Sequence, residues 1–161
     1  MLKERQQQLE VLAQTLSEKK WTVTCAESCT GGGLAFAFTS VSGSSNWFSQ
    51  SWVTYSNDAK INRLGVDEDI IERYGAVSMQ TVKQMATGAR REAAADIAVS
   101  ISGIAGPGGG SKEKPVGLVW FGFAFADYTL CEKQVFDGGR QRVREQAIDF
   151  AIQKLIQGLV E

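Results

Sequence analysis

The sequence predicts an α/β protein, a three-layer α/β/α sandwich whose mixed sheet is mostly parallel with one antiparallel strand. Short apolar strand patterns alternate with amphipathic helix patterns, which is typical of a parallel sheet covered on both faces. Two successive strand patterns, Val116–Ala126 and Thr129–Phe136, predict a hairpin that supplies the antiparallel member. The 161 residues, 43% hydrophobic and 22% charged, suit a single domain over 1–161 with a sizeable core.

The chain opens with a helix followed by a buried strand. Leucines recur at helical spacing within Leu2–Lys20, which predicts an amphipathic helix with one apolar face. Trp21–Ala26 is rich in β-branched residues and predicts a buried strand. Three successive glycines follow, and a second helix then runs through Phe38. The glycines therefore lie between a strand end and a helix start.

The next segment predicts one strand and two short helices. Aromatic and β-branched residues over Asn46–Tyr55 predict the second strand. Asn57 is a candidate cap for a helix over Asp58–Leu64, and Gly65 would end that helix. Asp67–Tyr74 predicts another short helix.

The second half of the chain continues the alternation. Ser78 is a candidate cap for a helix over Met79–Ala95 with an apolar inner face. Ile97–Ile101 predicts a short buried strand, and a glycine-rich loop, Gly103–Lys114, follows it. After the hairpin, two glycines interrupt the pattern before a last helix over Gln141–Leu159.

The chain contains no histidine, which excludes several kinds of site. A Ser-His-Asp or Cys-His triad cannot be built without an imidazole. Zinc, haem or iron sites that need a histidine ligand are excluded for the same reason. Acid–base chemistry must therefore come from Lys, Tyr, Cys, Asp or Glu.

Charge and apolar patterning indicate where the protein works. The 17 basic and 18 acidic side chains leave a net charge of −1, so we expect no binding of nucleic acid. The polar start, Met1–Gln8, is unlike a signal peptide, and the longest apolar stretch, Leu118–Ala126, is too short to cross a membrane. Cys25, Cys29 and Cys131 form no Cys-x-x-Cys pair and suit the reducing cytoplasm.

The first candidate site is the glycine-rich junction Ala26–Gly33. Strand ends of open α/β sheets bind ligands, and a helix start offers free N–H groups and a positive dipole end. Ser28 is placed there like a nucleophile, and the N–H groups that follow it could hold an oxyanion or a phosphate. The alternative interpretation, a capping serine in a tight turn, stays open on spacing alone.

The second candidate site is the segment from Tyr55 to Lys60. If Asn57 caps the following helix, Lys60 lies in its first turn, where the helix dipole would lower the pKa of the ammonium group. A lysine base needs such lowering, from about 10.4 to about 7–8. Tyr55 ends the strand and could relay a proton. An exposed lysine beside a half-buried tyrosine is the alternative.

Two further segments could bind anions. The glycine-rich loop could present N–H groups to an anion, although no Gly-Lys-Ser/Thr follows its glycines as in a Walker loop. Arg140, Arg142 and Arg144 enter the last helix, and guanidinium groups suit phosphate or carboxylate. A flexible surface loop and a solvated charged face are the respective alternatives.

Several long motifs occur in an order that resembles a known family. They are Thr24–Gly32, Val53–Lys60, Gly75–Ser78, Ser102–Gly109 and Glu113–Gly117. Together they resemble the C-terminal domain of competence/damage-inducible CinA proteins over roughly residues 9–158, in the stand-alone form of a nicotinamide-nucleotide amidase. The family usually shows Phe-x-Gly-Asp-Arg-x-x-Val-Arg near its end, and in this chain Gly139 replaces the aspartate.

The resemblance implies an activity and residue roles. It implies hydrolysis of nicotinamide mononucleotide to nicotinate mononucleotide and ammonia by a homodimer that needs no metal and no cofactor. By position, Ser28 is the nucleophile, Lys60 the general base and Tyr55 a supporting hydroxyl. The expected substrate-binding residues are Cys29, Thr30, Gly31, Gly32, Asn57, Gly103, Gly106, Gly108, Arg140 and Arg144. An inactive nucleotide-binding module of the same family is the alternative function.

Overall fold

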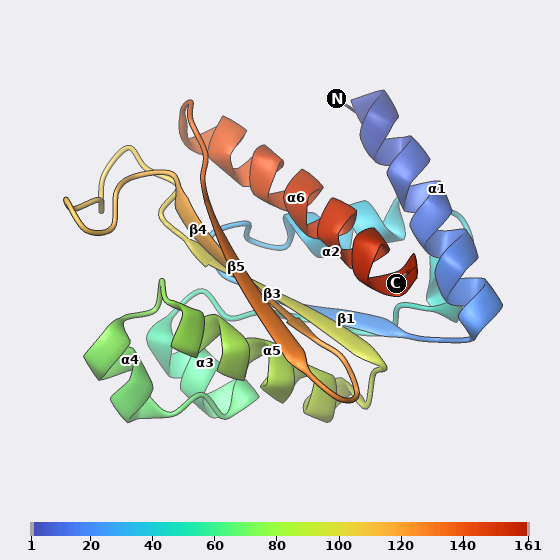
Figure 1. Ribbon diagram of the computed structural model, residues 1–161, viewed down its shortest axis with the longest axis horizontal. Coiled ribbons are helices and arrows are strands. Elements are labelled where there is room, and N and C mark those ends of the chain that lie inside the picture. Colours follow the sequence, from blue (N-terminus) through green and yellow to red (C-terminus); the bar gives the residue numbers. More distant parts are fainter. Residues whose placement is uncertain (1, 161) are drawn as a thin grey trace.

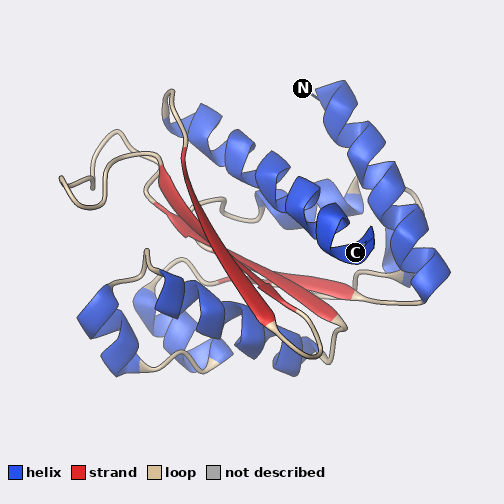
Figure 2. Cartoon of the chain, viewed as in Figure 1, coloured by secondary structure: helices blue, strands red, loops and turns tan. Residues whose placement is uncertain are grey.

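The computed structural model describes residues 2–160 and has three layers, with helices on both faces of one five-stranded sheet (Figures 1 and 2). In chain order the elements are α1 (Leu2–Lys19), β1 (Val23–Glu27), α2 (Gly33–Thr39), a 3-10 helix η1 (Ser44–Asn46), β2 (Trp52–Val53), α3 (Asn57–Leu64), α4 (Glu68–Tyr74), α5 (Met79–Ala93), β3 (Ile97–Gly103), β4 (Leu118–Ala124), β5 (Thr129–Val135) and α6 (Arg140–Val160). Helices α1, α2 and α6 cover one face, and α3, α4 and α5 cover the other.

The sheet has the order β2-β1-β3-β4-β5. Strand β1 pairs in parallel with both β2 and β3, whereas β4 runs antiparallel to β3 and β5. The predicted mostly parallel sheet with one antiparallel strand is therefore confirmed. Glu27 at the end of β1 is level with Val53 of β2 and Ile101 of β3, so the carboxyl ends of the three strands meet at one edge.

A crevice is expected at this edge because the chain changes direction around β1. After β1 the chain crosses one face through α2, and after β2 it returns to β3 across the other face through α3, α4 and α5 (Figure 1). When the connections that follow two neighbouring strands cross opposite faces of a sheet, the loops at the ends of these strands move apart. Open α/β sheets bind ligands in the crevice between such loops. The loops after β1 and β3 flank the crevice.

Two apolar cores hold the layers together. The larger core joins α1, α2 and α6 to the sheet and includes the predicted leucine face of α1, with Leu12 and Leu16 fully buried. The smaller core lies beneath α5, where the predicted inner residues Val82 and Met85 are also fully buried. The helical periodicity of the sequence therefore predicted the buried faces of α1 and α5 correctly.

The second predicted strand is much shorter than Asn46–Tyr55. Only Trp52–Val53 forms a strand beside β1, and the preceding residues form η1 and an irregular segment that meets β1 at one isolated bridge, between Phe48 and Val23. Trp47 is 1% exposed, and its ring packs edge-on against Phe38 with 5.7 Å between ring centroids. The aromatic side chains that favour a strand therefore fill the core beneath α2, and their backbone pairs with the sheet only at Val23.

The cap of α3 also differs from the prediction. The Ser56 hydroxyl, and not Asn57, accepts the hydrogen bond from the Ala59 N–H at 3.0 Å, so the helix starts one residue earlier at Asn57. Gly65 ends the helix in the left-handed region, as predicted. The predicted cap of α5 is confirmed, since the Ser78 hydroxyl accepts from the Thr81 N–H at 3.2 Å.

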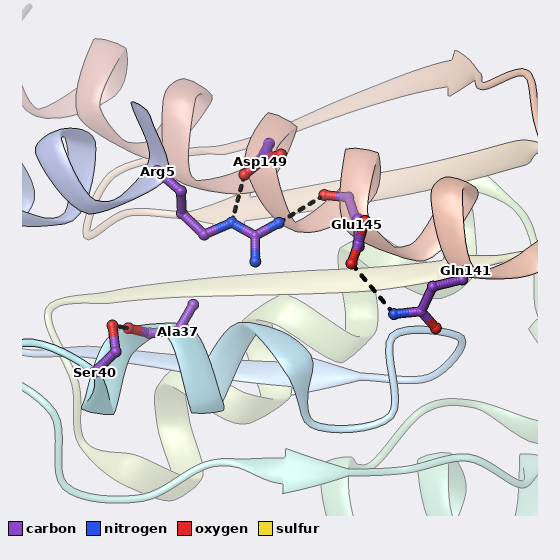
Figure 3. A network of polar contacts seen from close by, with 6 residues as sticks. All are labelled: Arg5, Ala37, Ser40, Gln141, Glu145 and Asp149. Atoms are coloured by element: carbon purple, nitrogen blue, oxygen red, sulfur yellow. Dashed lines mark hydrogen bonds and ion pairs between the residues drawn. The ribbon is translucent and has the colours of Figure 1, made fainter. Parts of the chain in front are cut away.

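Polar contacts fix α1 to α6 at the outer layer (Figure 3). The Arg5 guanidinium donates to the Asp149 carboxylate at 2.6 Å and to the Glu145 carbonyl at 3.2 Å. The side chain of Glu145 accepts from Gln141 at 3.3 Å. These contacts hold α6 in place, and its first turn begins with Arg140 at the crevice. None of the helices within residues 2–160 is both long and apolar enough to cross a bilayer.

Candidate active site

Ser28 comes directly after β1, in a turn formed by residues 28–32. Its N–H donates to the Ile101 carbonyl at 2.9 Å, which continues the pairing of β1 with β3 by one residue. The Gly31 N–H donates back to the Ser28 carbonyl at 3.0 Å, and Gly31 and Gly32 both adopt positive φ angles, of 59° and 98°. Glycine adopts such angles without a steric penalty, so the turn can be this tight.

The carboxylate of Glu27 anchors this turn from beneath. Glu27 is 0% exposed and accepts hydrogen bonds from the Thr30 hydroxyl at 2.6 Å and from the first-turn N–H groups of α2, Leu34 at 2.8 Å and Ala35 at 3.0 Å. A carboxylate is well placed there, since the start of a helix carries a partial positive charge. Sequence reasoning missed Glu27, although an acidic residue at the end of a buried strand was a visible signal.

The Glu27 carboxylate also limits where α2 can bind an anion. The N–H groups of Leu34 and Ala35, in the first turn of α2, already bind Glu27. Anion binding by α2 is therefore restricted to the turn before it, whereas the predicted loop after β3 remains available for a second anionic group.

Lys60 is a fully buried lysine that contacts the serine. It lies on α3 with 1% exposure, and its Nζ is 3.0 Å from the Ser28 Oγ. The same Nζ donates to the carbonyl oxygens of Thr54 at 2.8 Å and Tyr55 at 3.2 Å, directly after β2. Thr54 is in turn held to β1, because its N–H donates to the Glu27 carbonyl at 2.9 Å. The strand that precedes α3 therefore fixes the lysine head group.

Burial lowers the pKa of Lys60 from its ordinary value to about 8. The sequence predicted such lowering from the dipole of α3, but the physical cause in the structure is removal of the ammonium group from water. No carboxylate lies within ion-pair distance of the Nζ among residues 2–160 to oppose this effect. At pH 7 about one-tenth of Lys60 is consequently neutral, far more than for a lysine with an ordinary pKa.

The two carbonyl contacts also orient the amine. A neutral lysine amine keeps two N–H bonds and one lone pair. If the N–H bonds continue to serve Thr54 and Tyr55, the lone pair is directed at the third contact, Ser28. The Ser28 hydroxyl also lies 3.4 Å from the Tyr55 carbonyl. Because the Ser28 Oγ is in hydrogen-bond contact with the Nζ, the serine proton can pass to the lysine. The arrangement can activate a serine without histidine.

Tyr55 contacts Lys60 through its backbone carbonyl and Arg140 through its side-chain hydroxyl. Its carbonyl accepts from Lys60, whereas its hydroxyl accepts from the Arg140 guanidinium at 3.3 Å. Arg140 also donates to the Gly106 carbonyl at 2.7 Å, and so links α6 to the loop after β3. The geometry therefore gives no direct support to a proton relay through the Tyr55 hydroxyl, because that hydroxyl faces Arg140.

A cavity of about 280 Å³ opens above these groups. It lies at the crevice predicted by the topology, between the loops after β1 and β3. Its walls are Ser28, Cys29, Tyr55, residues 103–106, Gly108, Gly109 and Arg140. Seven of the predicted site residues thus line this cavity. An eighth, Lys60, lies outside the lining and contacts Ser28. Glycine dominates one wall, so a ligand can approach the backbone closely.

The remaining predicted site residues lie outside the cavity wall. Thr30 is buried and binds Glu27, and Arg144 donates to the Thr30 carbonyl at 3.4 Å. A Cβ on Gly31 would come within 3.2 Å of the Arg144 guanidinium, so these residues support the turn from the side of α6. Asn57 is exposed at the start of α3.

Cys29 lines the cavity but is a poor nucleophile. Burial raises the pKa of its thiol to about 11, which keeps the sulfur protonated near neutral pH. Residues 2–160 contain no group of three His, Cys, Asp or Glu side chains arranged to hold a metal ion. The chemically competent groups of the described cavity are therefore Ser28 and Lys60.

The family assignment rests on comparison with known proteins. The family model described as the CinA C-terminal domain matches residues 5–159. The chain belongs to the CinA C-terminal domain family. It is 56% identical over 147 residues to the nicotinamide-nucleotide amidohydrolase PncC of Enterobacter agglomerans, covering 91% of this chain and 90% of that protein. It is 50% identical over 153 residues to the protein of the same name from Escherichia coli K12, covering 94% and 93%.

A solved structure of the CinA family agrees with this fold. The competence damage-inducible protein A of Klebsiella pneumoniae superposes with a TM-score of 0.95 at 34% identity, over 98% of each chain. The resemblance expected from the motifs is thereby confirmed for the family and for the fold. Within this CinA domain, the motifs after β1, β2 and β3 are the segments that meet around the cavity.

Proposed function

We propose that this protein hydrolyses the carboxamide of nicotinamide mononucleotide to nicotinate mononucleotide and ammonia by a serine/lysine mechanism. The names of the two bacterial relatives support this substrate. The observation that carries the mechanism is the 3.0 Å contact between the Lys60 Nζ and the Ser28 Oγ, combined with a lysine pKa of about 8. A serine and a base in hydrogen-bond contact are the minimal requirement for acyl transfer.

The reaction proceeds in two stages. Neutral Lys60 takes the Ser28 proton while the Oγ attacks the carboxamide carbon, and the protonated lysine then returns that proton to the departing ammonia. The product of this stage is an ester between Ser28 and the nicotinoyl group of the nucleotide. Lys60, neutral again, takes a proton from water, and the hydroxide cleaves the ester to release the carboxylate. The proton returns to Ser28, so the enzyme is regenerated.

Backbone donors and Arg140 hold the negative charges. The N–H groups of Cys29, Thr30 and Gly32 are the candidates for the oxyanion, because Gly31, Leu34 and Ala35 already donate within the protein. The substrate phosphate binds at the opposite wall, formed by Gly103, Gly106 and Gly108 with the Arg140 guanidinium. Asn57 and Arg144 flank the site, at the start of α3 and behind the turn respectively.

Ammonia release from nicotinamide mononucleotide tests the activity directly. Wild-type protein should release stoichiometric ammonia in the presence of a chelator. Ser28→Ala and Lys60→Met should each lower kcat by at least about 10³-fold, and the double variant should be no worse, since both groups act in one step. Turnover retained by a purified Ser28→Ala protein would exclude the serine mechanism. A rise in melting temperature with nucleotide but no ammonia would instead indicate a binding module.

The same proposal includes a homodimer in the cytoplasm. Family resemblance supports the dimer, as do Phe36 on α2 and Val53 on β2, which are 79% and 51% exposed in the single chain. Sedimentation equilibrium should give twice the 17.5 kDa chain mass. Three free cysteines support the cytoplasmic location, which cell fractionation can check.

A further inference from the structure

Tyr55 presents an aromatic ring at the cavity that is exposed and yet held at both ends. The residue is 62% exposed and borders the cavity beside Ser28. Its carbonyl accepts from Lys60 at 3.2 Å, and its hydroxyl accepts from Arg140 at 3.3 Å. The first contact fixes the backbone, and the second fixes the far edge of the ring. An exposed ring fixed in this way is preorganised to receive a flat ligand.

No other aromatic side chain borders the described cavity. The remaining wall consists of glycines and an alanine, with Ser28, Cys29, Ile104 and Arg140. The carbon that Ser28 attacks is bonded directly to the substrate ring, so that ring must lie within a few ångströms of the serine. Tyr55 is the aromatic residue of this cavity wall, so its ring is the π surface offered to the substrate ring.

The Tyr55 ring also makes no aromatic or cation–π contact within residues 2–160. Within residues 2–160, the cation–π contacts involve the rings of Trp21, Trp120 and Phe150. The aromatic pairs among the same residues do not include Tyr55 either. Arg140 binds the hydroxyl at the rim of the ring. Because Tyr55 is also 62% exposed, a cation from solution can reach the ring.

We propose that Tyr55 determines specificity by stacking its ring against the cationic pyridinium ring of the substrate. The inference rests on the proposed function and goes beyond it by naming the group that recognises the ring charge. A pyridinium joined to ribose carries a positive charge, whereas free nicotinamide is neutral at neutral pH. The negative face of an aromatic ring attracts such a cation. Tyr55 would thus favour N-substituted nicotinamides over neutral aromatic amides.

The expected kinetic signature is a change in KM. The pyridinium charge is present in the substrate, in the transition state and in the product, so stacking stabilises all of them alike. Loss of an interaction of this kind raises KM and leaves kcat nearly unchanged. A proton relay through the Tyr55 hydroxyl would give the opposite result, a fall in kcat on loss of the hydroxyl.

Two variants separate these roles. Tyr55→Phe keeps the π face but loses the hydroxyl contact that fixes the far edge of the ring, so KM should rise by a smaller factor, about three-fold, without a large fall in kcat. Tyr55→Leu keeps apolar bulk and the backbone carbonyl but removes the π face, and should raise KM by about ten-fold. Tyr128→Leu is the matched control, because Tyr128 is 55% exposed on the hairpin far from the cavity wall.

The deciding experiment compares two substrates. One is nicotinamide mononucleotide, and the other is its neutral analogue, in which a 3-carbamoylphenyl ring replaces the pyridinium. In wild type and Tyr128→Leu, KM for the cation should be about ten-fold lower than KM for the neutral analogue, and Tyr55→Leu should lose that preference in KM. An unchanged preference in Tyr55→Leu, or a large fall in kcat in Tyr55→Phe, would overturn the inference and leave the amidase proposal intact. Failure of wild type to release ammonia from either compound would refute the proposed function itself.

Discussion

At the scale of single residues, the site depends on how a lysine is kept from water and still hydrogen-bonded. The three donors of the Lys60 ammonium meet Ser28 Oγ and two backbone carbonyls, so its burial leaves no unpaired proton. Two of these acceptors are peptide carbonyls without a formal charge, so they hold the amine in place but do not stabilise its charged form as a carboxylate would. The same contacts therefore position the base and permit its low pKa.

The pH dependence of the reaction follows from this pKa. Lys60 acts as a base only when neutral, and its pKa is lowered to about 8. Below that value kcat/KM should fall about ten-fold per pH unit, and above it kcat/KM should reach a plateau. Initial rates of ammonia release between about pH 6.5 and 9.5 can check this profile.

Lys60→Arg provides the control for the profile. An arginine keeps the positive charge but does not deprotonate in this range, so the variant should be inactive at every pH tested. A wild-type profile that is flat between about pH 6.5 and 9.5 would contradict the assignment of Lys60 as the base.

Sequence reasoning identified the two reactive residues but not their support. Ser28 and Lys60 could be selected because each follows a predicted strand end at the start of a helix. The burial of Lys60, which explains its pKa, depends on the packing of α3 against the sheet and has no local signature. Glu27 was missed because its role depends on folding back onto α2, and the cap of α3 fell to Ser56 instead of its neighbour Asn57.

At the scale of elements, the junction of β1 and α2 makes a prediction about stability. Glu27→Gln replaces one acceptor oxygen with an N–H₂ group, which would face an N–H donor of α2. Hydrogen bonds to a charged group contribute about 1.5–3 kcal/mol each, so we expect a loss of about 2–3 kcal/mol in the free energy of unfolding. Urea unfolding of the purified variant measures this loss.

Glu10→Gln, on the exposed face of α1, is the control for the same chemical change and should alter stability by less than about 0.5 kcal/mol. Equal stability of the two variants would show that the Glu27 carboxylate does not anchor the helix.

Close approach of α3 and α5 makes a second prediction at this scale. Alanine is the better helix former by about 1 kcal/mol, so propensity alone predicts that Gly88→Ala stabilises α5. A Cβ at Gly88, however, would lie 2.0 Å from the Leu64 carbonyl oxygen of α3. We expect the clash to dominate and to lower the melting temperature by several degrees, which calorimetry can measure.

Gly108→Ala is the matched control, because a Cβ there meets no atom within 4 Å. Its melting temperature should stay close to that of wild type. A higher melting temperature for Gly88→Ala would mean that the two helices can move apart freely.

The helices and long strands could be predicted because their periodicity reflects burial on one face. Helix α5 and strands β3 and β4 lie within one or two residues of the expected positions at most of their ends. The segment before β2 could not be predicted, because Trp47 suits a strand and a core equally well. Only its packing against Phe38 decides between them.

At the scale of the whole molecule, the cavity is closed by parts of the chain that are far apart in sequence. Ser28 follows β1 and Tyr55 follows β2, whereas the glycine wall comes from the end of β3 and the loop after it, and Arg140 comes from the start of α6. The topology predicts that the strand ends meet at one edge, since parallel strands share an orientation. It does not predict Arg140, whose place depends on how α6 crosses the sheet and on the contacts that hold it to α1.

Arg140 therefore tests whether the last helix completes the site. Arg140→Lys keeps the charge but loses the fork that joins Gly106 and Tyr55, and the planar geometry that suits a phosphate. We expect KM for nicotinamide mononucleotide to rise by about ten-fold or more, since a charged hydrogen bond contributes about 1.5–3 kcal/mol. For the nucleoside that lacks the phosphate, the same variant should change KM far less. Arg142→Lys is the control on the same helix, exposed and outside the cavity wall, and should alter neither value. An equal rise in KM for nucleotide and nucleoside in Arg140→Lys would show that the arginine shapes the cavity without binding the phosphate, and the glycine wall would then be the sole phosphate site of the proposed mechanism.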